Sequence, residues 1–122
     1  MERVLAGLTT HVLDVTRGCP APGVRIELYE LGDDGGRKLV TATTTNSDGR
    51  TDKPLIAPSE GRVGRFELVF HAGDYFRTQG AKLADPPFLD VVPIHFAVAD
   101  ASAHYHVPLI VSPWSYSTYR GS

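Results

Sequence analysis

The stretch Val24-Arg25-Ile26-Glu27-Leu28-Tyr29-Glu30-Leu31 opens with a regular alternation of aliphatic and polar side chains. An alternation of period two is the pattern of a β-strand that buries one of its faces. The same alternation returns in Gly64–His71, where phenylalanine and leucine take every second position. These two runs predict half-buried strands, and they set the character of the fold.

Similar β-prone runs fill most of the chain, separated by glycine, proline, asparagine and aspartate. Further strands are expected at Leu8–Val15, Leu39–Thr45, Leu89–Ala99, His104–Val111 and Trp114–Tyr119, with a short one at Thr51–Ile56. The tetrapeptide Asn46-Ser47-Asp48-Gly49 predicts a tight turn, because Asp-Gly accepts the positive φ that such turns need. About seven or eight short strands with frequent turn signals predict an all-β fold, an antiparallel β-sandwich.

One short α-helix is expected at Asp74–Gln79, with Asp74 as its N-cap and Gly80 at its end. The segment Gly18–Gly23 is expected to form a loop around Cys19, the single cysteine of the chain. One cysteine excludes an internal disulfide and a cysteine-based metal site.

The composition suits a soluble globular protein. The chain has 122 residues, which we expect to form a single domain over residues 1–122. Its net charge of −2, with basic residues spread along the sequence, argues against nucleic acid as a partner. No stretch approaches the roughly 20 apolar residues of a membrane helix, and no signal peptide is visible. We expect a cytoplasmic protein without membrane association.

Two histidines share one face of the expected strand His104–Val111. Because side chains alternate along a strand, His104 and His106 point together, opposite the apolar face that contains Val107. His11 lies in the first strand, where alone it would be read as exposed. Three histidines on strands could also hold Zn²⁺ with one open position. Periodicity supplies no ligand geometry, so we assign no metal.

The chain stops on Tyr119-Arg120-Gly121-Ser122, directly after an apolar, strand-like stretch. Terminal residues are normally frayed and tolerant of change. A terminus joined so closely to core-like sequence is expected to be held in place, where its polar groups could serve a site. From the residues alone, the prediction is therefore a β-sandwich with a histidine and arginine site near its C-terminus.

Four segments extend this prediction through resemblance. They are Leu8-Thr9-Thr10-His11-Val12-Leu13-Asp14, Asn46-Ser47-Asp48-Gly49-Arg50, Phe70-His71-Ala72-Gly73-Asp74-Tyr75-Phe76, and His104-Tyr105-His106-Val107-Pro108-Leu109 through to Ser117-Thr118-Tyr119-Arg120-Gly121-Ser122. Together they resemble the transthyretin-related 5-hydroxyisourate hydrolases, from about Leu8 to Ser122. The terminal tetrapeptide is the hallmark of that family.

The resemblance implies a transthyretin-like sandwich of two four-stranded sheets with one short helix. It also implies a homotetramer, a dimer of dimers, with a central channel and active sites at the dimer–dimer interface. No cofactor is implied. The matching site residues are His11, Arg50, His106 and the terminus Tyr119-Arg120-Gly121-Ser122, with His104 nearby.

The implied reaction opens 5-hydroxyisourate by hydrolysing a cyclic amide bond, which gives 2-oxo-4-hydroxy-4-carboxy-5-ureidoimidazoline on the route from urate to allantoin. Histidine can accept a proton near neutral pH, so His106 is the expected base. His11 would orient the water or return the proton to the leaving nitrogen.

The remaining matching residues receive supporting roles. Arg50 and Arg120 would supply fixed positive charge and planar hydrogen-bond donors to the substrate. Tyr119 would line the pocket, and Ser122 would offer a hydroxyl and a carboxylate.

Two alternatives stay open at this point. One is a transthyretin-like carrier that binds small aromatic ligands in the same channel without chemistry. The other, ranked third, is a zinc-dependent hydrolase.

Overall fold

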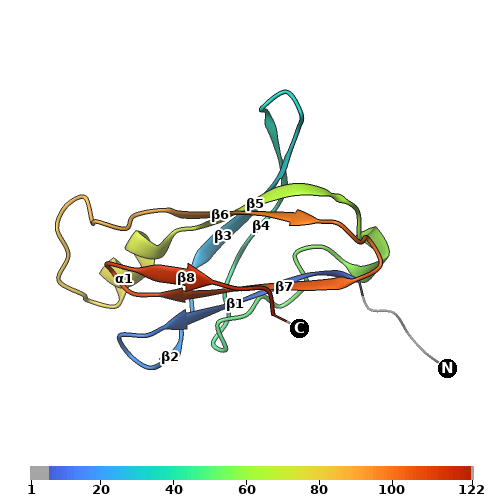
Figure 1. Cartoon of the computed structure of the whole chain (residues 1–122). Helices are drawn as coiled ribbons and strands as arrows, with labels where there is room; N and C mark the ends of the chain where they lie inside the picture. Colours follow the sequence, from blue (N-terminus) through green and yellow to red (C-terminus); the bar gives the residue numbers. More distant parts are fainter. Residues whose placement is uncertain (1–5, 122) are drawn as a thin grey trace.

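The structure, a computed structural model, describes residues 6–121. Two four-stranded β-sheets lie face to face, with a short helix at one end (Figure 1). The strands are β1 (Gly7–Asp14), β2 (Cys19–Pro20), β3 (Arg25–Leu31), β4 (Arg37–Thr44), β5 (Gly64–Phe70), β6 (Val92–Val98), β7 (His104–Val111) and β8 (Tyr116–Thr118). The helices are α1 (Ala72–Thr78) and the short 3-10 helix η1 (Pro58–Glu60). The predicted sandwich of two four-stranded sheets with one α-helix is confirmed.

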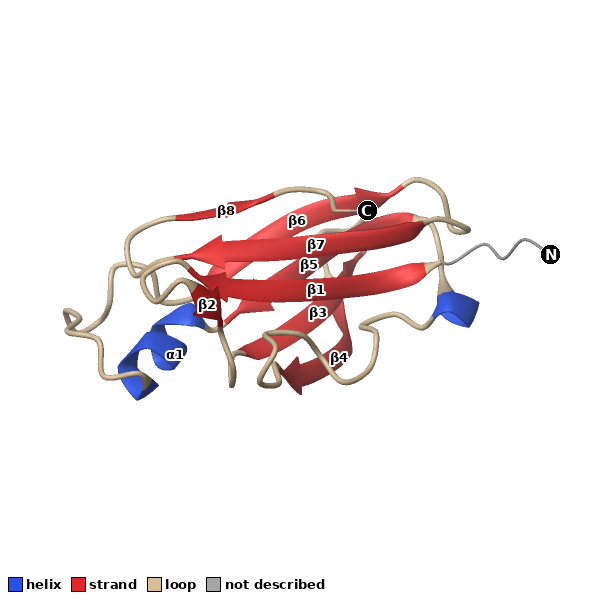
Figure 2. Ribbon diagram, turned by 90° about the horizontal axis from the view of Figure 1, so that it is seen from below, coloured by secondary structure: helices blue, strands red, loops and turns tan. Residues whose placement is uncertain are grey.

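The first sheet has the strand order β2-β1-β7-β8 and the second has the order β4-β3-β5-β6. Figure 2 shows the first sheet in front, with β1 and β7 side by side at its centre. Neighbouring strands are antiparallel throughout the named elements, except that β1 and β7 run parallel. This one parallel pair departs from the purely antiparallel arrangement expected from the sequence, and it brings the first and seventh strands together.

The core lies between the two sheets and follows the alternation read from the sequence. Ile26 and Leu28 of β3 and Phe66 and Leu68 of β5 are fully buried. Each fully buried side chain of this kind contributes about 1.5–3 kcal/mol relative to an exposed one. Stability therefore resides on the inner faces of the sheets, which leaves the outer face of β1 and β7 free to hold polar groups.

Three local expectations were wrong: the strand at Thr51–Ile56, the loop at Gly18–Gly23, and the start of the helix. Thr51–Ile56 forms no strand; it contributes only an isolated bridge between Ile56 and Leu8, and Pro54 lacks the N–H that a regular ladder would need. The expected loop at Gly18–Gly23 contains the two-residue strand β2, which pairs with the end of β1.

The helix also differs from its expected start. It begins at Ala72 after the N-cap residue His71, and Asp74 lies inside its first turn, where it forms an ion pair with Arg77 at 2.7 Å. Gly80, with a φ of 81°, follows the C-cap as expected. Among residues 6–121, neither helix has the length and apolar character needed to cross a lipid bilayer.

Candidate functional site

The site lies on the outer face of the first sheet, where β1 and β7 run side by side (Figure 2). The parallel register pairs Thr9 with His106, and pairs Gly7 with His104. On β7 the inner residues are buried, whereas His104 and His106 are partly buried on the other face. On β1 the same outer face presents Thr9 and His11, also partly buried. Strand parity had placed the histidines correctly.

Thr9 connects the two histidines of β7 through its hydroxyl oxygen. This oxygen lies 3.0 Å from Nε2 of His104 and 2.8 Å from Nδ1 of His106, both within hydrogen-bond distance. The two imidazole rings are nearly parallel, with an interplanar angle of 21° and centroids 6.5 Å apart. Sequence reasoning missed Thr9, because a threonine in a strand is explained by its β-propensity alone. Its only signal was its place on the same face as His11.

His11 is fixed by the turn that follows β4. Its Nε2 atom lies 2.9 Å from the carbonyl oxygen of Asp48. A carbonyl oxygen only accepts, so Nε2 of His11 donates and bears the proton. The Nδ1 atom of neutral His11 is therefore left with a lone pair that can accept a hydrogen bond from water.

The turn itself is built to sit against β1. The Asn46 side chain accepts hydrogen bonds from the backbone N–H groups of Asp48 and Arg50, at 2.9 and 3.2 Å. The N–H of Val12 donates to the carbonyl of Gly49 at 2.8 Å. Gly49 has a φ of 74°, and a Cβ atom there would lie 2.4 Å from the carbonyl oxygen of Val12. Only glycine allows this approach, which delivers Arg50 to the histidine face.

Arg50 and burial together keep the site histidines neutral. Desolvation lowers the pKa of His106 below 6.5, the positive charge of Arg50 lowers it further, and the neighbouring rings of His104 and His11 act in the same direction. Desolvation and the charge of Arg50 also lower the pKa of His11, while the Asp48 carbonyl opposes this shift. Both rings are therefore unprotonated near pH 7, which is the state that a general base requires.

The chain beyond β8 continues along β7 in the same register. Leu109 pairs with Thr118. Three residues earlier in β7 and three residues later in the terminus, His106 pairs with Gly121. Pro108 lies between these pairs and has no N–H to donate, which interrupts the ladder there. The N–H of Gly121 donates to the carbonyl of His106 at 2.7 Å. The terminus is thus held in place as far as the structure describes it.

Gly121 touches the ring of His106. A Cβ atom at this position would lie 2.6 Å from Cδ2 of His106, so a larger residue would displace the ring or the terminus. Opposite residues of antiparallel strands share a face, so the register assigns Tyr119 and Gly121 to the histidine face. Arg120 falls on the other face by the same parity.

The Arg120 side chain accordingly packs on the ring of Tyr105, and not on the imidazole rings of the histidine face. Its guanidinium carbon is 4.1 Å from the centre of the Tyr105 ring, a cation–π contact at the open edge between the sheets. It also makes a long hydrogen bond of 3.4 Å to the carbonyl of His104. The structure therefore brings together His11, Arg50, His104 and His106 of the predicted site, and places Arg120 elsewhere. The predicted role of Ser122 falls outside the described residues.

The structure was also searched for a metal-binding cluster and for cavities. Residues 6–121 contain no group of three or more His, Cys, Asp or Glu side chains placed to hold a metal ion.

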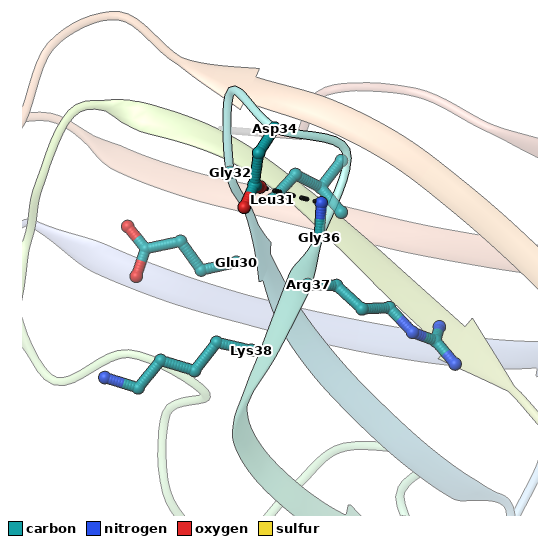
Figure 3. Close-up of a pocket in the computed structure, with 7 residues that line it drawn as sticks. All are labelled: Glu30, Leu31, Gly32, Asp34, Gly36, Arg37 and Lys38. Carbon is teal, nitrogen blue, oxygen red and sulfur yellow. Dashed lines mark hydrogen bonds between the residues drawn. The ribbon is translucent and has the colours of Figure 1, made fainter.

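A cavity of about 430 Å³ lies beside the β3–β4 hairpin, lined by residues between Glu30 and Lys38 (Figure 3). The hairpin is ordered by a 2.9 Å hydrogen bond from the N–H of Gly36 to Asp34. This cavity includes no residue of the histidine face.

Comparison with known proteins places the chain in a family. Residues 8–121 match the model of the HIUase/Transthyretin family. The 5-hydroxyisourate hydrolase of Deinococcus radiodurans is 60% identical over 116 residues, which cover 95% of this chain and 96% of that protein. The 5-hydroxyisourate hydrolase 2 of Rhizobium meliloti is 58% identical over 115 residues, covering 94% and 95%.

A more distant relative has a similar fold. Sea bream transthyretin, solved in complex with thyroxine, superposes with a TM-score of 0.83 at 27% identity, covering 93% of each chain. Its two-sheet architecture is therefore shared, although nearly three quarters of the aligned residues differ. From the family match and these likenesses, the chain belongs to the HIUase/Transthyretin family.

Proposed function

We propose that this protein is a 5-hydroxyisourate hydrolase, which opens 5-hydroxyisourate to 2-oxo-4-hydroxy-4-carboxy-5-ureidoimidazoline in urate degradation. The observation that supports this most strongly is the pair His11 and His106, both neutral near pH 7 and both under the charge of Arg50. A neutral base beside a fixed cation is what the hydrolysis of an amide by water requires. Two relatives at 58% and 60% identity are named for this activity.

His106 acts as the general base in this proposal. Its free Nε2 takes a proton from a water molecule, whose oxygen attacks the carbonyl carbon of the cyclic amide. His11 orients that water by accepting a hydrogen bond at Nδ1. The carbonyl oxygen becomes an oxyanion, which the guanidinium of Arg50 stabilises. When the C–N bond breaks, the proton held by the histidines passes to the leaving nitrogen, and the ring opens.

The terminus completes the site in our proposal. The register on either side of Tyr119 gives it the parity of the histidine face, and in our proposal it lines the substrate pocket. A substrate contact by Arg120 would require its side chain to leave the ring of Tyr105. Ser122, which lies outside the described residues, would contribute its hydroxyl to the site in this proposal.

We further propose that the working enzyme is a homotetramer, a dimer of dimers, with each site at the dimer–dimer interface. The histidine face supports this, because a half-polar outer face of a sheet suits a shared cleft better than bulk water. We also propose that residues 1–122 form one domain and that the enzyme works in the cytoplasm. A single thermal unfolding transition and cell fractionation would test these two assignments.

The carrier alternative is less well supported. The transthyretin described above shares 27% of its aligned residues with this chain, against 58% and 60% for the two hydrolases. A face on which two histidines are linked by a hydroxyl also has no evident use in carrying an aromatic ligand. For the zinc alternative, activity that survives exhaustive chelation would exclude it.

The decisive test is a direct assay. Urate oxidase generates fresh 5-hydroxyisourate, and its decay is followed by ultraviolet absorbance with and without the protein. We expect the wild type to accelerate the decay and His106→Ala to lose at least about 100-fold, since general acid–base groups contribute roughly 10²–10⁴-fold. The control is His95→Ala, because His95 is exposed on β6 of the other sheet. No acceleration by the wild type would refute the function.

The same assay separates the roles within the site. His11→Ala is expected to keep part of the activity, since it removes the orientation of the water but leaves the base. Near-normal turnover by His106→Ala, together with an inactive His11→Ala, would reverse the two assignments. A chain truncated after Thr118 should keep the sandwich and lose activity; an active truncation would remove the terminus from the site.

A further inference from the structure

We propose that Thr9 couples His104 and His106 into a proton relay, so that the proton taken up at His106 is stored as charge on His104. Thr9 is then a positioning residue for the proposed hydrolysis, and His104 is the terminal proton acceptor. This inference rests on the proposed function, which it deepens. It starts from the two hydrogen bonds of the Thr9 hydroxyl, at 3.0 Å to Nε2 of His104 and 2.8 Å to Nδ1 of His106.

Counting hydrogens limits what these three groups can do. A hydroxyl has one proton to donate, and a neutral imidazole has one N–H and one lone pair. If Thr9 donates to His104, then Nδ1 of His106 must donate to Thr9, and Nε2 of His106 is a free base. If Thr9 donates to His106, then Nε2 of His104 must donate, and Nε2 of His106 bears a proton. The first arrangement makes His106 a base and the second makes it an acid.

The proton transfer reverses the hydrogen-bond directions of the first arrangement to those of the second and adds one proton, which ends on His104. Nε2 of His106 forms a bond to a proton of the attacking water, which becomes hydroxide as it bonds to the carbonyl carbon. The Nδ1 proton of His106 moves to the oxygen of Thr9, and the hydroxyl proton of Thr9 moves to Nε2 of His104. His106 ends neutral with its proton on Nε2, and His104 ends as an imidazolium with protons on both nitrogens.

The return path restores every group. Nε2 of His106 gives its proton to the leaving nitrogen as the C–N bond breaks. Thr9 then returns a proton to Nδ1 of His106, and His104 returns one to Thr9. Protons and charge balance over the cycle, and no further reactant is needed.

Electrostatics gives the relay its advantage. The groups that face His106 are Arg50 from the turn, His11 from β1 and His104 from β7, and a positive charge on His106 would be repelled by Arg50. A lone His106 would have to hold its charge against that repulsion throughout the reaction. With the relay, the charge moves to His104, whose own backbone carbonyl accepts a 3.4 Å hydrogen bond from Arg120. The advantage is therefore that His106 stays neutral and holds its proton on Nε2, ready for the leaving group.

The backbone fixes the spacing that the relay needs. The parallel register sets Thr9 directly opposite His106, with His104 two residues earlier on the same face. His104 is opposite Gly7, which has no side chain to compete for its ring. Gly121 also lies close to the ring of His106, since a Cβ atom there would be 2.6 Å from its Cδ2. The three polar groups are thus held in line by two glycines and one strand register.

Imidazole tautomers test the relay without any substrate. In protein labelled with ¹⁵N-histidine, the ring nitrogen shifts report which nitrogen bears the proton. We expect His104 and His106 each to be fixed with the proton on Nδ1 in the resting protein. Thr9→Val keeps the shape but removes the hydroxyl, so both rings should lose that fixed tautomer. Thr9→Ser should preserve it. Thr44→Val, on exposed β4 of the other sheet, is the matched control.

Kinetics provides the second readout. Thr9→Val should lower kcat at least about tenfold with a smaller change in KM, while Thr9→Ser stays within about threefold, in line with the contribution of acid–base groups. His104→Ala should cost about as much as Thr9→Val, and combining the two should cost little more. The solvent isotope effect should depend on the deuterium fraction in a curved manner in the wild type and linearly in Thr9→Val.

The outcomes separate the relay from the function. Mixed or Nε2–H tautomers in the wild type, or wild-type kinetics in Thr9→Val, would overturn the relay and leave the hydrolase intact. Fixed Nδ1–H tautomers in a protein that fails to accelerate substrate decay would overturn the function instead. If Thr9→Ser fails like Thr9→Val, a hydroxyl at position 9 is not enough to keep the activity, which also refutes the relay.

Discussion

At the scale of single residues, Arg50 affects the site twice, through the charge it offers to substrate and through its effect on the histidines. After desolvation, its charge is the largest cause of the lowered pKa of both His106 and His11. Because the fold favours the neutral rings, their contribution to stability is full above pH 6.5 and is lost as the pH falls through their lowered pKa values. Acid therefore weakens the fold and the base together.

Replacing Arg50 by glutamine should separate these two effects. The acid limb of kcat/KM should lie below pH 6.5 in the wild type, because protonation of His106 removes the base. In Arg50→Gln the pKa of His106 rises, so the limb should move to higher pH, in addition to a loss of activity at all pH values. Arg50→Lys keeps the charge and should leave the limb in place. An unmoved limb in Arg50→Gln would contradict this account.

Gly121 should be sensitive for a steric reason. A methyl group there would lie 2.6 Å from the ring of His106, so Gly121→Ala is expected to lower kcat about tenfold or more by moving the base. The melting temperature should hardly change, because no core residue is involved. Ser117→Ala, on exposed β8, serves as the control. Equal activities of the two variants would show that the ring tolerates the methyl group.

Strand parity was enough to place His104 and His106 on one face, because the direction of each side chain follows from its position within a single strand. That His11 joins them came from the family resemblance, since it lies in a different strand. The placement of Arg120 was beyond that reasoning. Its face depends on the register between β7 and β8, which is set by the loop between them rather than by a local pattern. Thr9 was missed because its hydroxyl acquires a role only when β7 lies beside it.

At the scale of elements, the turn that presents Arg50 is fitted to β1 by one glycine. Gly49→Ala should destabilise the fold in two ways, through its positive φ at about 1–2 kcal/mol and through the clash with the Val12 carbonyl at about 1–3 kcal/mol. Activity should fall as well, since Asp48 and Arg50 move with the turn. Denaturant unfolding measures the first effect and the substrate assay the second.

Gly35→Ala is the matched control, which isolates the cost of the positive φ. Gly35 has a φ of 84° in the β3–β4 hairpin, and a Cβ there would meet no atom within 4 Å. It should show the cost of the positive φ alone and keep full activity. If the two variants lose the same free energy of unfolding, the close approach to β1 does not contribute.

The strands were predictable where alternation or β-rich composition was strong, and less so where pairing alone defines them. β2 is two residues long and exists only because β1 lies beside it. Thr51–Ile56 has strand-like residues but finds a single bridge partner. The parallel pairing of β1 with β7 joins distant segments, and no local signal in either strand reveals its direction.

At the scale of the whole molecule, the proposed tetramer predicts that activity depends on assembly. A homotetramer would have four times the chain mass of 13.2 kDa. If each site lies at the dimer–dimer interface, specific activity should fall on dilution over the same concentrations at which the mass falls from tetramer to dimer. Light scattering and the substrate assay measure the two curves. Full specific activity in a dimer would place the complete site within one half of the assembly.

The parallel pairing of β1 and β7 has a consequence for how the protein folds. Thr9 and His106 are separated by 97 positions in the chain, and they meet only when the seventh strand joins the first. Contacts between such distant segments require a large loop to close, and they are slow to form. A growing polypeptide on the ribosome cannot assemble the site until β7 has emerged. Recovery of turnover during refolding would therefore report the docking of β7, and no earlier event.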